Sequence, residues 1–401
     1  MLEIPLKQRQ PRLDWPILVA VVGLMVLGTV FIASATLARE SSSSLPWYRL
    51  EHFRQGAWYV LGIGLAGLSC VADYRRIARF AVVVYWIAIA FLVALLIPKV
   101  GATHGWNALR WIDLGPFQFQ PSEFAKLAFI LMMANYLSRP ESELRPFRPF
   151  LQALGMTILP FVLVLKEPDL GSALVLLPVG LVMMFVAGVP GRRLFHLLLG
   201  LTLVVALLLA EMFLLPPQWQ KFKVEPYQRR RLMVYFGIDF VPPRATEIER
   251  QRALKEYRDA AHNVEQALIS VGSGGLTGKG WRQGTQNALG YLPRAVAHND
   301  FIFSVIAEES GFVGSVTVIT LYTVILFSGI KIAGQARDRL GRLMAVGVVT
   351  LLFCHVFVNI GMNIRLMPVA GIPLPLLSYG GTSVLCSLVA LGLLQNIYLH
   401  R

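Results

Sequence analysis

The sequence contains few charged residues and very little cysteine. Charged residues make up 15% of its 401 positions, and only three cysteines occur. These cysteines, Cys70, Cys354 and Cys386, all fall within apolar stretches without paired spacing, so neither a disulfide framework nor a cysteine-ligated metal site is indicated. No short leading hydrophobic stretch ends in a small-residue cleavage site. We therefore expect the first apolar segment to remain in the protein as an uncleaved anchor.

Apolar residues dominate the chain instead. Hydrophobic residues make up 55% of it, and the mean hydropathy is +0.59, which is more apolar surface than one soluble core could bury. A helix needs about 20 mostly apolar residues to cross a bilayer. Such runs occur at 15–36, 56–72, 79–98, 121–137, 150–166, 170–188, 193–215, 301–330, 342–362 and 382–399. The sequence predicts an all-α polytopic membrane protein with about ten transmembrane helices and a long loop between the seventh and eighth.

The formal net charge of +14 follows the loops between these spans. Nucleic-acid binding would need a basic face with interleaved aromatic residues, and no such pattern is present. Alternate short loops hold about twice as many Lys and Arg residues as the others, as cytoplasmic loops do. This predicts cytoplasmic N- and C-termini and an extracytoplasmic long loop. Topology and contact with membrane lipids account for the charge.

The long loop, residues 216–300, begins with mixed aromatic and basic residues that we expect along the membrane interface. Apolar residues then recur every three or four positions over 247–271, which predicts an amphipathic helix. The segment Gly272 to Gly280 superficially resembles a phosphate-binding loop, but no Ser or Thr follows a Gly-Lys pair. Its glycines would let the backbone approach another group closely. We predict one membrane domain, 1–401, with this loop embedded in it.

Charged residues inside apolar spans need a partner or a purpose. Glu123 and Lys126 lie three positions apart on one helix face, where they form either a structural ion pair or part of a polar cavity. Arg110 is expected at the outer interface beside Trp111. The run from Lys166 to Asp169 favours a short outer turn; the alternative is a wet cavity in which Asp169 binds a cation or an arginine.

Acidic residues also flank the start of the eighth span. Asp300 follows the long loop directly, and the simplest role for it is a helix cap worth about 1 kcal/mol. The alternative is a functional carboxylate, because His298 is near and the head group of a lipid-borne substrate would lie at this surface. Glu308 and Glu309 follow at membrane depth, where we expect them to hydrogen-bond or pair across helices.

The stretch 363–383 is rich in proline and glycine. Pro368, Pro373 and Pro375 exclude a continuous helix. Irregular backbone at membrane level is tolerated only when it is buried in protein or lines a wet cavity. We therefore expect a re-entrant or outer-leaflet element, with Ser378 and the polar residues up to Ser383 capping the last span.

This last stretch resembles the signature of the SEDS family of shape, elongation, division and sporulation proteins. The matching residues are Asn363, then Pro368-x-x-Gly-x-Pro-x-Pro375, then Ser378-Tyr-Gly-Gly. Further blocks in family order are Arg110-Trp-Ile-Asp-Leu-Gly, Gln120-Pro-Ser-Glu-Phe-Ala-Lys126, Pro168-Asp-Leu-Gly171 and Asp300-Phe-Ile-Phe-Ser-Val-Ile-Ala-Glu-Glu309. The segment Gly278 to Gln286 is similar to the RodA branch of cell elongation rather than to the FtsW branch of division.

The resemblance implies a peptidoglycan glycosyltransferase whose substrate is lipid II, an undecaprenyl-pyrophosphate-linked disaccharide pentapeptide. The product would be a longer glycan strand, with undecaprenyl pyrophosphate released. It also implies a class B penicillin-binding protein, a transpeptidase of the elongation machinery, as partner. The family's essential acid corresponds to Asp300. Family members commonly carry Glu-x-His-Thr-Asp, whereas this chain has Ala295-Val-Ala-His-Asn-Asp300, so a role for that glutamate does not carry over.

Our mechanistic hypothesis makes Asp300 the general base that takes the proton from the acceptor sugar's 4-hydroxyl. An aqueous Asp, with a pKa of about 3.9, is a feeble base; a helix N-terminus would weaken it further and desolvation would strengthen it. Arg110, Lys126 and the Gly272 to Gly280 backbone are candidate pyrophosphate holders. A divalent cation, Mg²⁺ or Mn²⁺, could share that task, with Asp169 or Glu123 as candidate ligands, although no ligand spacing demands it. The expected substrate-binding residues are Arg110, Glu123, Lys126, Asp169, Gln283, Gln286, His298 and Ser378.

Two other classes of function stay open on the sequence. A many-span protein with buried charges could be a transporter that flips lipid II. A scaffold for the transpeptidase would leave the intramembrane acids unexplained. The long outer loop that ends at an acidic residue favours an enzyme, because a flippase has no need of one carboxylate outside the bilayer.

Overall fold

The computed structural model describes residues 13–36, 46–97, 110–113, 115, 118–214, 226–239, 246–292 and 297–401. Each predicted span contains a helix. These helices are α1 (Trp15–Ala35), α3 (Glu51–Val71), α5 (Ala81–Leu95), α6 (Pro121–Leu137), α8 (Phe147–Lys166), α9 (Leu170–Val186), α10 (Gly191–Leu214), α14 (Ile302–Gln335), α15 (Arg339–Asn363) and α16 (Gly381–Leu399). By length and composition, α1, α8, α10, α14, α15 and α16 could cross a membrane, while α5 and α9 are shorter apolar helices. The predicted all-α architecture is confirmed.

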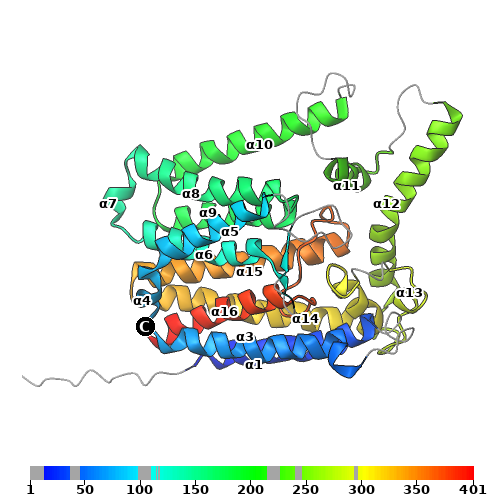
Figure 1. The fold of residues 1–401 in the computed structure, drawn as a ribbon, viewed down its shortest axis with the longest axis horizontal. Helices are drawn as coiled ribbons and strands as arrows, with labels where there is room; N and C mark the ends of the chain where they lie inside the picture. The colour runs from blue at the N-terminus through cyan, green and yellow to red at the C-terminus, as the bar shows by residue number, and fades with distance from the viewer. Residues whose placement is uncertain are drawn as a thin grey trace, which may run out of the picture.

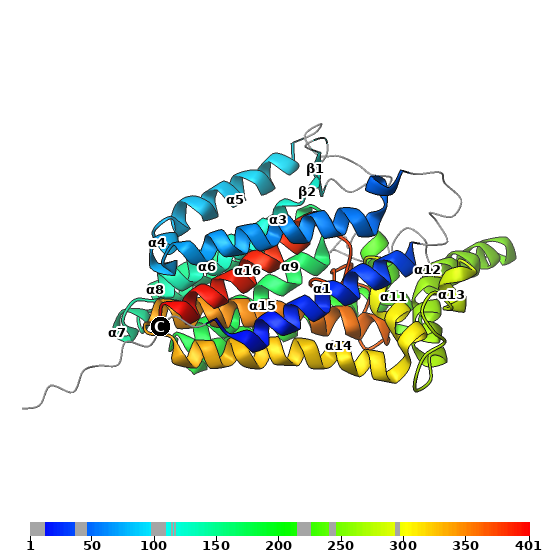
Figure 2. The same cartoon turned by 90° about the horizontal axis from the view of Figure 1, so that it is seen from below.

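The helices form one bundle whose long axes run roughly side by side (Figures 1 and 2). The helices α6, α15 and α16 are the most enclosed, because α16 packs on α3, α15 packs on α9 and α14, and α6 packs on α5. In contrast, α10 lies along one edge with most of its apolar side chains exposed, as expected for a helix surrounded by lipid.

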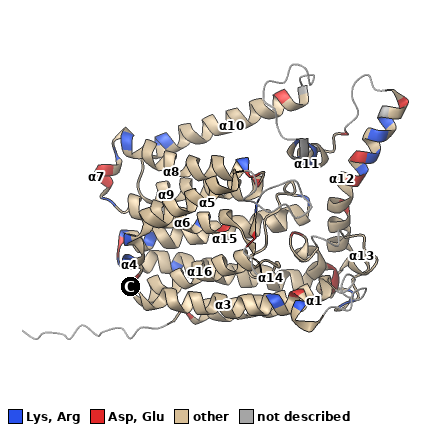
Figure 3. Cartoon of the chain, in the orientation of Figure 1, with Lys and Arg blue, Asp and Glu red and all other residues tan. Residues whose placement is uncertain are grey.

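Both ends of the described chain meet at one end of the bundle. The backbone N–H of Asp14 donates to Gln395 Oε1 (3.0 Å), and Gln395 Nε2 donates back to the Asp14 carbonyl (2.9 Å). The short helices α4 (Tyr74–Arg79) and α7 (Glu141–Leu144) lie at this same end, where Lys and Arg gather (Figure 3). We call it the basic end. The loops that are rich in Lys and Arg in the sequence therefore lie together at one end of the bundle.

The opposite end, which we call the loop end, carries the long loop. Its helices are α11 (Pro226–Phe236), α12 (Glu247–Ser273) and α13 (Thr285–Ala288). The predicted amphipathic helix is confirmed as α12, which packs against α14 and α15 with one half and projects from the bundle with the other (Figure 1). The one-turn 3₁₀ helix Trp47–Arg49 and a small antiparallel hairpin complete the described elements. That hairpin, β1 (Ile112–Asp113) with β2 (Gln118–Phe119), pairs Ile112 with Phe119 and was not predicted.

Residues 364–380, between α15 and α16, form the predicted irregular element. Hydroxyl groups from two helices hold its backbone: Tyr59 donates to the Leu376 carbonyl (2.6 Å) and Tyr322 donates to the Pro375 carbonyl. The amide of Gln55 donates to the Ser378 carbonyl (3.1 Å). Side chains thus satisfy three carbonyls in the buried part of this backbone. The cap of α16 lies within the predicted stretch, at Gly380, but no side chain of the described residues makes a capping hydrogen bond there.

Candidate active site

Asp300 lies at the loop end, in the turn that precedes α14. The helix begins at Ile302, with Phe301 at the cap position, and no side chain of the described residues caps it. The helix-cap role considered for Asp300 is therefore wrong. Instead, the Asp300 carbonyl accepts hydrogen bonds from the amides of Asn359 (3.2 Å) and Asn363 (3.1 Å) in α15. These two bonds fix the backbone of the turn against α15.

The neighbouring residue adds a second attachment. Ser378 donates its hydroxyl to the Asn299 carbonyl (2.6 Å) and accepts from the backbone N–H of Leu374 (2.8 Å). Ser378 is 2% exposed, so the structure makes it a brace between the irregular element and the Asp300 turn. Its expected contact with substrate stays a prediction.

Two arginines and one acid surround the Asp300 carboxylate. Burial raises the pKa of Asp300 to about 6, while the charges of Arg231 and Arg110 lower this pKa and the charge of Asp169 raises it. Desolvation therefore wins over the nearby cations. A carboxylate with this pKa is ionised at neutral pH and is a stronger base than an aqueous Asp. General bases work best when their pKa lies near the working pH.

Arg231 reaches this site from α11, and no feature of the sequence distinguishes it from its basic neighbours. Its guanidinium donates to the Val369 carbonyl (3.0 Å), which brings α11 onto the irregular element. The neighbouring Arg230 instead forms an exposed ion pair with Glu256 of α12 (3.3 Å). The basic run 229–231 looked like an interfacial anchor. Successive side chains on a helix point about 100° apart. This difference in direction alone places Arg231 at the site and Arg230 at the surface.

Arg110 and Asp169 meet at the predicted turn between α8 and α9. Arg110 donates to the carbonyls of Glu167 (3.3 Å) and Pro168. Asp169 caps α9 by accepting from the N–H of Ser172 (3.2 Å). Its other oxygen accepts from the side chains of Gln120 and Ser122 at the start of α6. The turn is confirmed, and it brings Arg110 and Asp169 within electrostatic reach of Asp300.

Glu123 and Lys126 form the buried ion pair that was one of the two predicted alternatives. Lys126 Nζ lies 2.7 Å from Glu123 Oε1 and 2.9 Å from His355 Nε2 in α15. Their side chains are 3% and 1% exposed. The geometry favours the structural ion pair over the polar cavity. A direct contact of either residue with substrate stays a prediction.

The remaining expected substrate-binding residues occupy other places. Gln286 donates its backbone N–H to Glu308 Oε1 (3.0 Å), and Gln283, three positions earlier, donates its backbone N–H to the Gly280 carbonyl (3.1 Å). His298 lies 3.1 Å from Glu51 and beside the ring of Tyr379. The structure thus brings Arg110 and Asp169 to Asp300 and sets the two glutamines apart from it.

The glycine-rich segment does not offer its amides to a phosphate. The N–H of Gly278 donates to Gly274, that of Lys279 to Glu308 (3.0 Å) and that of Gly280 to Glu309 (3.0 Å). The expected close approach is confirmed, but the partner is helix α14. Pyrophosphate binding by these three amides is excluded, because each already donates to a backbone carbonyl.

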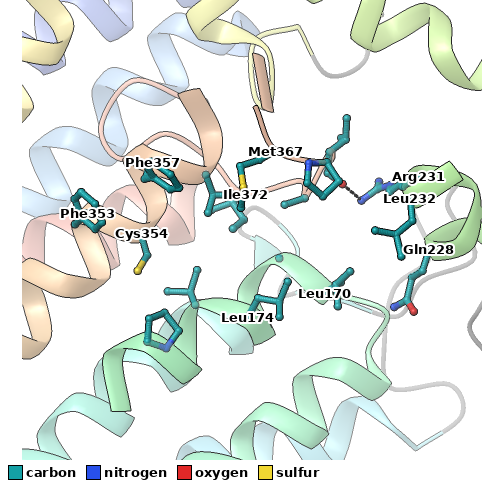
Figure 4. Close-up of a pocket in the computed structure, with 17 residues that line it drawn as sticks. Leu170, Leu174, Gln228, Arg231, Leu232, Phe353, Cys354, Phe357, Met367 and Ile372 are labelled. Carbon is teal, nitrogen blue, oxygen red and sulfur yellow. Dashed lines mark hydrogen bonds between the residues drawn. The ribbon is translucent and has the colours of Figure 1, made fainter. Parts of the chain in front are cut away.

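An apolar cavity of about 420 Å³ opens beside Arg231 (Figure 4). Its walls come from α9, α11, α15 and the irregular element. Leu174, Leu232, Phe353, Phe357, Met367 and Ile372 supply much of the lining. Arg231 stands at one side of this lining, so a cationic group borders an apolar space.

The residues considered for a divalent cation do not fit one. Asp169 already accepts three hydrogen bonds, and Glu123 is paired with Lys126. Within the part of the chain that the structure describes, no three His, Cys, Asp or Glu side chains are grouped to hold a metal ion.

The profile of the FtsW/RodA/SpoVE family, described as cell cycle proteins, matches residues 15–401. The chain belongs to this family. This SEDS protein is 38% identical over 347 residues to the peptidoglycan glycosyltransferase MrdB of Escherichia coli K12, a match that covers 85% of this chain and 84% of that protein.

Solved structures agree with the assignment. A chain of a peptidoglycan synthase complex that coordinates polymerization and crosslinking matches with a TM-score of 0.73 and 30% identity, over 96% of this SEDS protein and 97% of that chain. The rod shape-determining protein RodA of Thermus thermophilus matches with a TM-score of 0.63 and 28% identity, over 96% of each chain. The predicted polytopic membrane fold is thereby confirmed.

Proposed function

We propose that this SEDS protein is a peptidoglycan glycosyltransferase of the RodA type that polymerises lipid II into glycan strands, with Asp300 as general base. The observation that carries this proposal is the setting of Asp300. Its carboxylate has a pKa raised to about 6, two arginines face it, and its backbone is braced by α15 and the irregular element. A partly desolvated, rigidly held carboxylate is what proton abstraction from a hydroxyl requires.

In the proposed reaction, Asp300 takes the proton of the acceptor sugar's 4-hydroxyl. The freed oxygen attacks the anomeric carbon of the donor, and the bond from that carbon to the pyrophosphate breaks with inversion. Arg231 and Arg110 stabilise the charge that develops on the leaving pyrophosphate, because guanidinium groups bind phosphate oxygens with paired hydrogen bonds. Both arginines lie close enough to Asp300 to influence its pKa.

The apolar cavity beside Arg231 supports a lipid-linked substrate. A polyprenyl chain needs apolar walls, and its pyrophosphate needs a cation at their edge. Arg231 meets both needs, since it lines the cavity and faces the Asp300 site. The first isoprene units of the polyprenyl chain would lie between α9 and α15.

The orientation follows from the basic end of the bundle. We propose that this end, with both termini, lies in the cytoplasm of a bacterial cell and that the loop end, 216–300, lies outside the inner membrane. The gathering of Lys and Arg at the basic end supports this orientation. The carboxylate of Asp300 would then meet substrate at the outer surface.

A transpeptidase of the class B penicillin-binding type is the proposed partner within the elongation machinery. The likeness to a chain of a solved peptidoglycan synthase complex supports such a partnership. The projecting half of α12 offers exposed charged surface at the loop end, where a cross-linking enzyme would work.

The test uses purified protein in liposomes with lipid II on one side. A polymerase converts lipid II into glycan ladders and releases undecaprenyl pyrophosphate. A lipid II flippase, the rival function, moves labelled lipid II between leaflets and forms no ladder. Translocation without ladders, in the presence of the partner transpeptidase, would overturn the proposal.

A further inference from the structure

Helix α14 is broken nine residues after its start. Gly311 has φ 65° and ψ −156°, so its backbone is not helical. In a continuous helix, the N–H groups of Phe312 and Val313 would donate to the carbonyls of Glu308 and Glu309. The break leaves two donors and two acceptors without helical partners at membrane depth, where each needs another one.

The glycine-rich segment of the long loop supplies all four partners. The N–H of Phe312 donates to the Gly275 carbonyl (2.9 Å), and that of Val313 to the Leu276 carbonyl (3.1 Å). In return, the N–H groups of Lys279 and Gly280 donate to the Glu308 and Glu309 carbonyls (3.0 Å each). The loop therefore replaces the two missing helical hydrogen bonds with four of its own.

Only glycine permits this contact at two positions. A Cβ at Gly274 would lie 2.0 Å from the Ala307 carbonyl oxygen, and one at Gly278 would lie 2.1 Å from that of Glu309. Gly278 also has a φ of +80°, which other residues rarely adopt. In contrast, no described atom lies within 4 Å of the corresponding point at Gly272, at the end of α12.

The side chain of Glu308 also holds this segment in place. It is fully buried, and its Oε1 atom lies 2.6 Å from Lys279 Nζ. The same oxygen accepts from the hydroxyl of Thr285 (3.0 Å) and from the N–H of Gln286 (3.0 Å). One carboxylate thus ties together both ends of the turn that follows the glycine-rich segment.

We propose that Glu308 and segment 274–286 form a positioning unit for Asp300. The break separates the short stretch 302–310, which follows Asp300 directly, from the longer stretch 312–335. Because the loop completes the break, it sets the direction of 302–310 and so the place of the Asp300 carboxylate. The proposal rests on the proposed function, since it assigns these residues to the positioning of its general base. None of them contacts the reacting atoms.

The first test compares Gly278→Ala with Gly272→Ala in the full-length protein with its transpeptidase. Gly278→Ala displaces the segment from α14, and a misplacement of about 1 Å in a catalytic group costs on the order of 100-fold in rate. We expect kcat to fall by about that factor with KM for lipid II little changed. Gly272→Ala should leave both values as in the wild type.

The pH profile separates positioning from loss of folded protein. The groups facing Asp300 are Arg231 from α11, Arg110 ahead of β1 and Asp169 at the start of α9. If Asp300 moves relative to them, the midpoint of the acid limb of kcat/KM shifts. A smaller folded fraction would lower the rate equally at every pH and leave the midpoint in place. An unshifted midpoint in Gly278→Ala would overturn the proposal.

A second pair of variants keeps the proposal testable if Gly278→Ala does not fold. Thr285 is exposed, and Thr285→Val keeps its shape while removing the hydroxyl that Glu308 accepts from. We expect kcat about tenfold lower, as for loss of one hydrogen bond to a charged group, and recovery in Thr285→Ser. Equal activity of the valine and serine variants contradicts the proposal. Asp300→Asn, measured in the same assay, separates a failure of the positioning proposal from a failure of the proposed function. An active Asp300→Asn would overturn the general-base assignment.

Discussion

Asp300 and Arg231 face the same point in space, although they belong to different elements of the loop end. A Cβ placed on Gly371 would lie 3.7 Å from Asp300 Oδ2 and 3.9 Å from Arg231 Nη1. Gly371 of the irregular element therefore lies close to both the proposed base and the arginine. This arrangement would place the proposed proton abstraction and the proposed pyrophosphate binding side by side, and it can be tested from each of the three residues.

The charge of Arg231 holds the pKa of Asp300 down against the effect of burial. Arg231→Gln removes that charge, so we expect the pKa of Asp300 to rise above about 6 and the acid limb of kcat/KM to move to higher pH. The rate at pH 7 falls both because less Asp300 is ionised and because the pyrophosphate loses a cation. The measurement is the polymerisation rate between pH 5 and pH 9.

Arg230 supplies the matched control for that experiment. It lies next to Arg231 in α11 but pairs with Glu256 at the surface. Arg230→Gln should leave the midpoint unchanged, since an exposed ion pair is worth only about 0 to 1 kcal/mol. Equal shifts in the two variants would point to the general charge of α11 rather than to Arg231.

Gly371 should not tolerate a side chain without loss of activity. In Gly371→Ala, the new methyl group would lie in contact with both Asp300 Oδ2 (3.7 Å) and Arg231 Nη1 (3.9 Å), and we expect kcat/KM to fall about tenfold, which is about 1.4 kcal/mol. Gly371 has a positive φ of 68°, and Gly237→Ala is the control, because Gly237 has a similar φ of 70° but no described atom lies within 4 Å of its Cβ position. If both variants lose the same activity, backbone strain explains the effect and the contact with Asp300 and Arg231 does not matter.

The apolar cavity should bind the lipid part of the substrate. Leu174 in α9 lines it and is 47% exposed, so Leu174→Trp fills the cavity without disturbing the packed core. We expect KM for lipid II to rise several-fold, and the rise to be smaller for an analogue with a short prenyl chain. Leu198→Trp on α10, equally exposed, should have no effect on KM. The same KM change with both chain lengths would count against a prenyl site.

The buried ion pair is expected to act on stability. Lys126→Met leaves the Glu123 carboxylate buried without its cation, a change that destabilises by about 3 to 5 kcal/mol. The double variant Glu123→Leu, Lys126→Met removes both charges and should recover most of that loss. Thermal unfolding in detergent measures both. A double variant that is stable yet inactive would instead favour a functional polar cavity at this pair.

The spans and the irregular element could be predicted because they depend on local properties. Apolar runs of the required length, basic residues in alternate loops and three prolines in 368–375 each act within one segment. The sequence also showed that Asp300 precedes the eighth span, but a helix cap was a reasonable alternative to a functional carboxylate at that position. What excludes that role is the start of α14 at Ile302, with Phe301 at the cap position and no side chain of the described residues capping the helix.

The remaining features of the site depend on contacts between distant segments. Arg231 is one of three consecutive arginines, and only the docking of α11 on Val369 shows which of them faces Asp300. The glycines of 274–280 predicted that this backbone would approach another group closely. The sequence did not identify that group, because the break at Gly311 that exposes the backbone of α14 was not predicted. The apolar pattern of this span does not indicate the break, because glycine is common within membrane helices.

The most direct test of Asp300 as general base is glycan polymerisation from purified lipid II by Asp300→Asn, with Asp239→Asn, an exposed acid of the same loop, as control. Both variants must be as stable and as monodisperse as the wild type and must bind the transpeptidase. We predict glycan ladders from the wild type and Asp239→Asn and none from Asp300→Asn. Ladders of wild-type length and rate from Asp300→Asn would contradict the account.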